Sequence, residues 1–206
     1  MADLQPIVYV VDDDESMLNT VRCLAESLGL EAKTYSAPRT FLHEFDGSRP
    51  ACLVLDVQMP EMSGLELQEL LVTRGVRMPT IIFTAHGEVP GAVRAMRTGA
   101  LDYLEKPFSN QTLLARLRQA AQHAVQMHQQ AIVQNEVSAR LQGLSKRENQ
   151  VMRGLADGLA NKQIAAQLGL SEKTVEVYRS RLMKKLGVHT IAELVRIVLS
   201  APRTTQ

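Results

Sequence analysis

The sequence of 206 residues has few cysteines, no long hydrophobic run and almost no net charge. Its two cysteines, Cys23 and Cys52, are too few for a disulfide framework or a four-ligand zinc site. Both stand among apolar residues, so we expect two buried, reduced thiols. No stretch approaches the roughly 18 consecutive apolar residues of a membrane span, and the first residues lack the basic region of a secretory signal. These absences predict a cytoplasmic protein that does not contact a membrane.

The net charge of +1 hides two halves of opposite sign. Residues 1–122 hold 11 lysines and arginines against 16 aspartates and glutamates, a balance of −5. Residues 123–206 hold 12 against 6, a balance of +6. This asymmetry favours two domains with different partners. The basic half suits a polyanion such as a nucleic acid, but its charge needs a motif beside it to support that inference.

The acidic half alternates short apolar runs with helical stretches. Strands are predicted at 7–11, 31–35, 52–55, 80–84 and 101–105, and helical patterns cover 16–28, 64–74 and 92–97. Strands that alternate with helices form βαβ units and a parallel sheet with helices on both faces. The pattern therefore predicts an α/β domain with a flavodoxin-like, doubly wound sheet of five parallel strands.

Polar residues with distinctive chemistry follow four of these strands. They are Asp12, Asp13 and Asp14 after the first, Asp56 after the third, Thr84 after the fourth and Lys106 after the fifth. Taken singly, an aspartate after a strand is most often a turn former or a helix cap. Together they should meet, because ligands of open α/β sheets bind at the carboxyl ends of the strands. Converging carboxylates need a cation, for which Mg²⁺ is suited, and a lysine and a threonine can donate to a phosphoryl group.

Four segments around these residues carry a family resemblance. VVDDDES, LDVQMPEMSG, FTAH and LEKPF resemble the signature segments of two-component response-regulator receiver domains, over roughly residues 5–122. The string from Asp56 to Gly64 and the Lys106-Pro107-Phe108 triplet are highly specific. AHGEVP, at residues 85–90, resembles the FixJ and StyR branch of that family.

The resemblance implies a role for each of these positions. Asp56 would accept a phosphoryl group from the phosphohistidine of a sensor histidine kinase. Mg²⁺ would be held by Asp12, Asp13, Asp56 and the backbone carbonyl of Gln58. Lys106 and Thr84 would contact the phosphoryl group, and Tyr103 would be the switch aromatic that moves with Thr84. A protein of this kind is not a dedicated enzyme and has no catalytic residues of its own, even where it removes its own phosphoryl group.

The acidic run after the first strand allows two other readings. Asp12-Asp13-Asp14-Glu15-Ser16 also resembles the start of haloacid-dehalogenase-type phosphatases, in which Asp12 would be the nucleophile and Asp14 the acid. That family's later acidic motif is missing, because Thr84 is followed by Ala-His-Gly, and the reading leaves Asp56 unexplained. An EF-hand is excluded because the loop lacks glycine at its sixth position and glutamate at its twelfth.

A helical pattern without proline or glycine runs through residues 109–142. Its apolar residues recur at spacings of three and four as far as Ala131, where the stripe weakens. The segment is either a helical spacer or a helix that pairs with a second copy or docks the two domains. We therefore expect a receiver domain at 1–122, a helical linker at 123–142 and a second domain at 143–206. His123 and His128, five residues apart, are expected to be surface residues.

The basic half reads as a small all-α domain of four helices with a helix-turn-helix. Ser145 and Glu148 form a capping-box pattern, Asn161 is the expected cap of the second helix, and Gly169-Leu170-Ser171 forms the turn before the third. LSKRE, the stretch GLANKQIAAQLGLSEKTVEVYRSRLMKKLGV and the trailing AEL resemble the LuxR/NarL type of DNA-binding domain. The third helix is then expected to enter the major groove of promoter DNA.

Candidate DNA contacts all lie on this third helix. They are Lys173, Thr174, Glu176, Val177, Arg179, Ser180, Arg181, Lys184 and Lys185. Glu176 could accept from a base, orient Arg179 or do little, whereas the lysines are better suited to phosphates.

The two resemblances together identify the chain as similar to response-regulator transcription factors of the FixJ/StyR kind. They imply activation by phosphoryl transfer to Asp56, a homodimer when phosphorylated, and room for a contact with RNA polymerase. The alternative is a constitutive DNA-binding protein whose receiver serves only as a dimerisation module.

Overall fold

The structure is a computed structural model that describes residues 5–85 and 89–200. The chain divides into two compact units, the first ending at Gln129 and the second beginning at Gln130. This division falls within the segment predicted as a linker. Within the residues that the structure describes, no helix is long and apolar enough to span a membrane.

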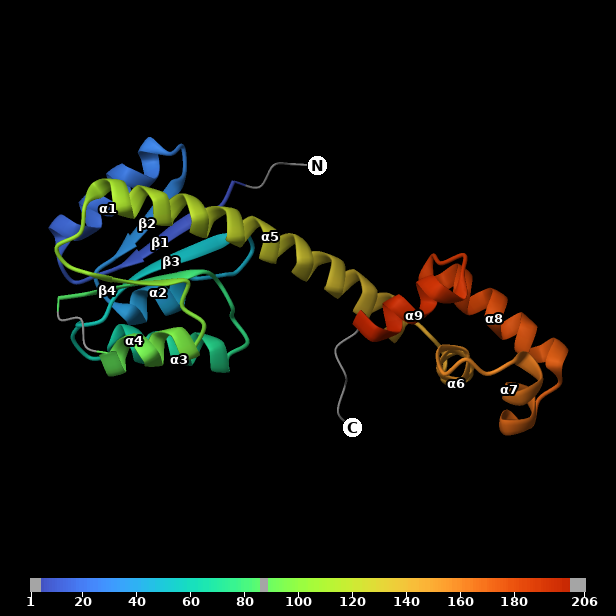
Figure 1. Cartoon of the computed structure of the whole chain (residues 1–206). Helices are drawn as coiled ribbons and strands as arrows, with labels where there is room; N and C mark the ends of the chain where they lie inside the picture. The colour runs from blue at the N-terminus through green and yellow to red at the C-terminus, as the bar shows by residue number, and fades with distance from the viewer. Residues whose placement is uncertain (1–4, 86–88, 201–206) are drawn as a thin grey trace. The chain divides into compact units, whose positions relative to one another are not determined.

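The first unit is a five-stranded parallel sheet with helices on both faces, which confirms the predicted fold class (Figure 1). The strand order is β2-β1-β3-β4-β5. Its elements, in chain order, are β1 Ile7–Val11, α1 Glu15–Ser27, β2 Glu31–Tyr35, α2 Pro38–Glu44, β3 Ala51–Asp56, α3 Gly64–Thr73, β4 Thr80–Thr84, α4 Val89–Arg97, β5 Asp102–Glu105 and α5 Asn110–Gln142, the last of which continues into the second unit.

The side chains of β1 alternate between two hydrophobic cores. Ile7, Tyr9 and Val11 pack on the face that carries α2, α3 and α4. Val8 and Val10 pack on the opposite face, against α1 and α5. All five residues are buried, because helices cover the sheet on both sides. This explains why β1 is a continuous apolar run rather than an alternating one.

Two details of this unit differ from the predictions. Cys52 is buried as expected, but Cys23 is exposed, because it lies on the side of α1 opposite the buried Leu18, Val21 and Ala25. The short helix α2 was not predicted. Pro38 at its first position is a usual start signal, but the helix has no side-chain cap and no long apolar repeat beside it.

The second unit is all-α, as predicted. Its helices are α6 Lys146–Ala156, α7 Asn161–Leu168, α8 Glu172–Leu186 and α9 Ile191–Ser200. Val151, Ile164, Val175, Leu182 and Leu194 belong to its hydrophobic core. A left-handed Gly169, with φ of 65°, ends α7 and allows the tight turn into α8.

The start of α7 corrects one prediction. Asn161 was expected to cap this helix, but it is the first helical residue, and Ala160 occupies the cap position. Gln163 replaces the missing cap, because its Oε1 accepts a hydrogen bond from the Ala160 backbone N–H at 2.8 Å. The side-chain hydrogen bond at the start of α7 thus comes from Gln163 inside the helix and not from the residue at the cap position.

An ion pair between the buried Glu148 and the exposed Lys185 joins the first and third helices of the second unit. Glu148 is 3% exposed and accepts from the Lys185 ammonium at 2.8 Å and from the Ser145 backbone N–H at 2.7 Å. The hydrogen bond from Lys185 and those from Ser145 lower the pKa of Glu148 to about 2. The Ser145 capping box was predicted from the sequence, but the partner on α8 was not.

We predict that this ion pair makes the second unit sensitive to acid. Because the pKa of Glu148 is lower in the folded chain than its ordinary 4.5, its contribution is complete above that pH and is lost as the pH falls towards 2. Thermal unfolding followed by circular dichroism should therefore show a steeper loss of stability between about pH 5 and pH 3 in the wild type than in Glu148→Gln. Glu172→Gln, an exposed site at the start of α8, should behave as the wild type. Parallel curves for all three proteins would contradict the prediction.

Candidate functional site

The predicted strand-end residues come together at the carboxyl edge of the first unit's sheet. Asp12 follows β1, Asp56 ends β3, Thr84 ends β4 and Lys106 follows β5. The strand order places β1 beside β3 and β4 beside β5, so the four positions share one edge. Asp12, Asp56 and Thr84 are 1%, 5% and 2% exposed, so these polar groups are held within the protein.

Lys106 joins the two buried carboxylates. Its Nζ lies 2.7 Å from Asp56 Oδ1 and 2.9 Å from Asp12 Oδ2. The ammonium also lies 5.9 Å from the centroid of the Phe83 ring, which packs against Phe108. One cation therefore faces two anions, and the group as a whole has an excess of negative charge.

Backbone N–H groups hold the remaining carboxylate oxygens. Asp56 Oδ2 accepts from Gln58 N at 2.5 Å, and Asp12 Oδ1 accepts from Asp14 N at 2.9 Å. The loop after Asp56 then folds back so closely that a Cβ at Gly64 would lie 2.1 Å from the Asp56 backbone oxygen. Only glycine fits there, which gives a physical reason for the glycine that closes the motif.

The burial of these charges changes their pKa values in a consistent way. Burial raises the pKa of Asp12, although the Asp14 N–H and Lys106 partly offset it. Burial alone would lower the pKa of Lys106, but hydrogen bonds to Asp56 and Asp12 outweigh that effect and raise it. The lysine therefore stays positively charged at neutral pH, which the two carboxylates require.

The three consecutive aspartates have three different environments. Asp12 is buried, Asp13 is exposed, and Asp14 caps α1 by accepting from the Ser16 N–H at 2.9 Å. Among the described residues, no group of three histidine, cysteine or carboxylate side chains is placed to hold a metal. The structure thus brings Asp12 and Asp56 together but leaves Asp13 outside the cluster.

The same donors nevertheless fit a magnesium ion. Mg²⁺ usually takes one or two carboxylates and keeps several water molecules, so it does not need a cage of three side chains. Asp12 and Asp56 supply two converging carboxylates with more negative charge than Lys106 neutralises. Asp13 follows Asp12 in the sequence and is open to solvent.

Thr84 and Tyr103, the predicted switch residues, lie on neighbouring strands. The Thr84 backbone oxygen accepts from the Lys106 N–H at 2.7 Å, so β4 is directly bonded to the segment that carries the lysine. The half-buried Tyr103 packs against the core beneath α4. Its hydroxyl oxygen lies 3.1 Å from where a Cβ on Gly91 would be. Gly91, which was not singled out in the sequence, thus lets Tyr103 approach α4 closely.

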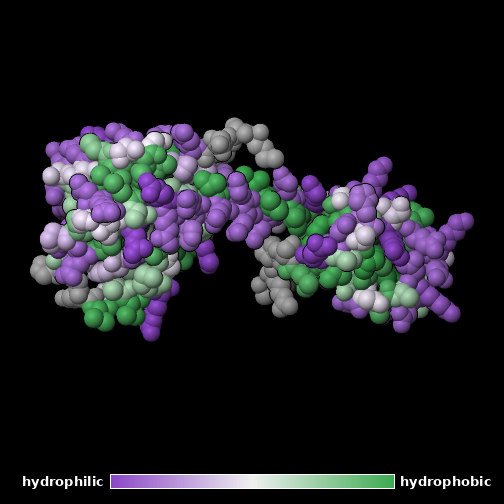
Figure 2. Space-filling view, turned by 45° about the horizontal axis from the view of Figure 1, so that its top comes forward, coloured by the Kyte–Doolittle hydropathy of each residue, from purple (hydrophilic) through white to green (hydrophobic). Residues whose placement is uncertain are grey.

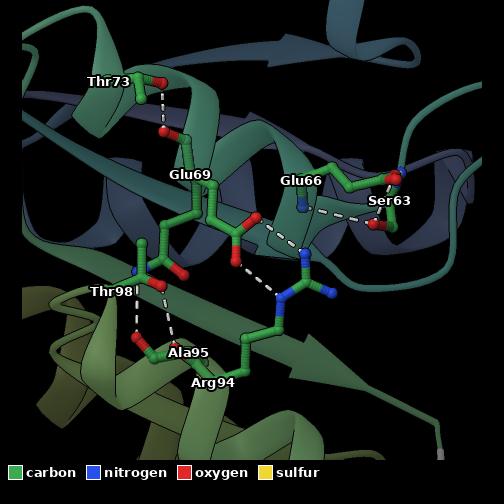
Figure 3. A network of polar contacts seen from close by, with 8 residues as sticks. Ser63, Glu66, Glu69, Thr73, Arg94, Ala95 and Thr98 are labelled. Carbon is green, nitrogen blue, oxygen red and sulfur yellow. Dashed lines mark hydrogen bonds and ion pairs between the residues drawn. The ribbon is translucent and has the colours of Figure 1, made fainter.

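α4 buries little apolar surface and is joined to α3 by an ion pair. Ala95 is its buried residue, whereas Val89, Val93 and Met96 are 74%, 43% and 51% exposed. The Arg94 guanidinium binds both carboxylate oxygens of Glu69 on α3, at 2.7 and 2.8 Å (Figure 3). Hydrophobic side chains are visible at this end of the first unit in Figure 2. An amphipathic helix with its apolar side chains outward offers a contact surface.

The predicted DNA-binding residues lie on α8, and most of them are solvent-exposed. The exposed ones are Lys173, Glu176, Val177, Ser180, Arg181, Lys184 and Lys185, and the half-buried ones are Thr174 and Arg179. The buried residues of the helix, Val175, Leu182 and Leu186, form the opposite face. Long hydrophilic side chains project from the second unit in Figure 2. α8 therefore has a free polar face of the kind that a DNA groove accepts.

Lys185 differs from the other basic residues of α8. Its ammonium is bound to Glu148 at 2.8 Å and also lies 3.4 Å from the Gly143 backbone oxygen. The end of α5 contacts the same region, since Arg140 donates to the Leu186 carbonyl at 3.3 Å. Of the predicted phosphate contacts, Lys185 thus already has an acidic partner within the unit.

Comparisons with known proteins agree with this division. Residues 8–118 match the response regulator receiver domain family, and residues 142–198 match the luxR family of bacterial regulatory proteins. The response regulator protein TmoT of Ectopseudomonas mendocina is 41% identical over 96% of this chain and 90% of its own length. The transcriptional regulatory protein FixJ of Azorhizobium caulinodans is 43% identical over 94% and 92%.

Solved structures show the same relationship. The response regulator StyR aligns over 95% of this chain and 98% of its own, with a TM-score of 0.81 and 42% identity. Full-length FixJ from B. japonicum aligns over 94% and 96%, with a TM-score of 0.57 and 38% identity. With both domain families matched in one chain, the protein belongs to the response regulators that combine a receiver domain with a LuxR-type DNA-binding domain.

Proposed function

We propose that this response regulator accepts a phosphoryl group on Asp56 from the phosphohistidine of a sensor histidine kinase and thereby regulates its binding to promoter DNA. The observation that carries the proposal is the pairing of one ammonium, on Lys106, with two buried carboxylates, Asp56 and Asp12. Such a site holds a carboxylate ready beside a cation that can later bind phosphoryl oxygens.

The transfer itself needs only the Asp56 side chain as nucleophile. A carboxylate oxygen of Asp56 forms a bond to phosphorus while the bond between phosphorus and the kinase histidine nitrogen breaks, and the imidazole leaves. The product is an acyl phosphate with about two negative charges. Lys106 and the Thr84 hydroxyl would then turn towards its oxygens. No further catalytic residue is proposed, and the chain is not a dedicated enzyme.

We infer that Mg²⁺ binds before this transfer, held by Asp12, Asp13, Asp56 and the Gln58 carbonyl. When bound, the ion neutralises negative charge on the phosphoryl oxygens as the bond to Asp56 forms. The contribution of this chain is to hold Asp12 and Asp56 together in a buried, rigid arrangement. Asp13 adds charge at the open side of the site.

Phosphorylation is proposed to act through α4. Movement of Thr84 towards the phosphoryl group would free space for Tyr103, which contacts α4 at Gly91. The exposed Val89, Val93 and Met96 would then form the surface of a homodimer. A dimer could place two copies of α8 on half-sites about one DNA turn apart. We infer that this takes place in the cytoplasm, where promoter DNA and RNA polymerase are available.

A constitutive DNA-binding protein is the second candidate, since the exposed face of α4 would suit a dimer that needs no phosphorylation. The two candidates differ in one measurable respect. Treatment of the full chain with acetyl phosphate and Mg²⁺ should strengthen DNA binding in a regulated protein, whereas a constitutive binder would show the same affinity before and after. An unchanged affinity would exclude the proposed regulation.

We predict that Asp56→Asn abolishes phosphorylation, because the amide is not a nucleophile towards phosphorus. Labelling of the full chain by radioactive acetyl phosphate in the presence of Mg²⁺ measures the effect. Asp14→Asn is the matched control, since asparagine caps α1 as well as aspartate does and labelling should persist. Acid-labile label retained by Asp56→Asn but lost in Asp14→Asn would instead support the phosphatase reading.

We predict that Asp13→Asn weakens Mg²⁺ binding by about tenfold or more, since a negative ligand is lost at the mouth of the site. Calorimetric titration of the full chain with MgCl₂ tests this. Asp46→Asn, an exposed carboxylate in the loop that precedes β3, serves as control and should leave the affinity unchanged. Equal affinities for all three proteins would remove Asp13 from the metal site.

We predict different effects for two basic residues of α8. Lys184→Ala should weaken binding to all DNA sequences alike and reduce the salt dependence of log K by about one, as for a phosphate contact. Arg179→Ala should relax sequence preference, because a guanidinium that reads guanine contributes about 1–3 kcal/mol of discrimination. Titrations of the full chain with specific and with random DNA duplexes, at several salt concentrations, separate the phosphate contact from the base contact. Arg196→Ala, an exposed charge on α9, controls for charge alone.

A further inference from the structure

A cavity of about 460 Å³ opens at the end of the first unit's sheet that is opposite Asp56. It lies where α3 ends, where β4 and β5 begin, and beside α4 and α5. Its apolar lining includes Leu71, Val76, Met78, Leu101 and Met127. A volume of this size is within the range of small-molecule sites. None of the residues assigned to phosphoryl transfer contributes to it.

One buried polar group in the cavity wall lacks a partner. Gln68 is 3% exposed, and its Nε2 donates to the Ala95 backbone oxygen on α4 at 3.3 Å. Its Oε1 is buried without a hydrogen-bond partner among the described residues. Rotating the amide would only place Oε1 against the Ala95 oxygen, so the orientation is settled by the backbone. An acceptor directly behind the cavity surface is therefore left without a donor, and an N–H or O–H group that reached it would satisfy it.

The cavity wall contains basic residues and no acidic ones. Arg77 and Arg97 both line it and are solvent-exposed. Neither has a carboxylate partner in the part of the chain that the structure describes, whereas Arg94, one helical turn before Arg97, is held by Glu69. Among the lining residues there is no aspartate or glutamate. A guanidinium without a partner beside an apolar cavity is suited to a carboxylate, which it can bind through two hydrogen bonds.

We propose that this cavity binds a small carboxylic acid with a branched apolar body and an N–H donor. The carboxylate would pair with Arg77 or Arg97, the apolar body would lie against Leu71, Val76 and Met78, and the N–H would donate to Gln68. Apolar contact supplies most of the affinity in such sites, and the few polar groups fix the orientation.

Two methionines of the wall allow the proposal to be tested in the full chain. Met78 and Met127 line the cavity, whereas Met152 lies in the core of the second unit. The protein is labelled with ¹³C at its methionine methyl groups, and the signals are assigned with single Met→Leu variants. N-acetyl-L-leucine is the probe, and N-acetyl-L-leucinamide, which lacks the carboxylate, is its matched control. The acid should shift Met78 and Met127 in a saturable way and leave Met152 unchanged.

The variants separate this site from non-specific apolar binding. Replacing Arg77 and Arg97 together by alanine should weaken binding of the acid by about tenfold and leave the amide unaffected. Gln68→Leu, which retains the apolar bulk, should weaken both probes, and Arg74→Ala, an exposed arginine outside the cavity, should weaken neither. In each variant without ligand, a Met152 signal at the wild-type position shows that the second unit is folded. The signals of Met78 and Met127 report in the same way on the first unit. Equal binding of acid and amide, or no shift at about 10 mM acid, would overturn the proposal.

Discussion

The contact between Lys106 and two buried carboxylates is the constraint on which the first unit depends. Charged groups are costly to bury unless they are paired and hydrogen-bonded. Here Asp12 and Asp56 each receive the ammonium on one oxygen and a backbone N–H on the other. Three different strands contribute to this arrangement, so the sheet order determines it. The negative charge that remains after pairing favours a cation over a neutral or anionic ligand.

Of the helices on its face of the sheet, α4 has the fewest buried residues. α4 has Ala95 as its buried residue and is tied to α3 by the Arg94–Glu69 ion pair and by Gln68. Exposed ion pairs contribute little stability, about 0–1 kcal/mol. Elements with few buried apolar contacts are the first to move when a neighbouring site changes. A small change at Thr84 and Tyr103 therefore acts on an element that resists it weakly.

Much of the fold could be predicted from the sequence, because strand ends and helix caps are local signals. The run at residues 7–11, the aspartates after it and the Ser145 cap all lie where the pattern placed them. The errors arise where tertiary contacts decide. The exposure of Cys23 depends on which side of α1 faces the sheet, and the cap at Ala160 depends on a side chain three residues later. The pairing of Lys185 with Glu148 and the cavity beside Gln68 join residues that are distant in sequence, so no local pattern could reveal them.

The composition of the edge strand β2 has a consequence for assembly. Its first four residues alternate between exposed and partly buried, Tyr35 is buried, and the exposed Glu31 and Lys33 carry charges of both signs on this edge strand. Charged side chains on an edge strand oppose the addition of a further strand from another molecule. At the other edge β5 has only four residues, which offers a short template. Both edges of the sheet therefore offer little to a further strand, and the faces covered by helices remain the broader surfaces of the first unit.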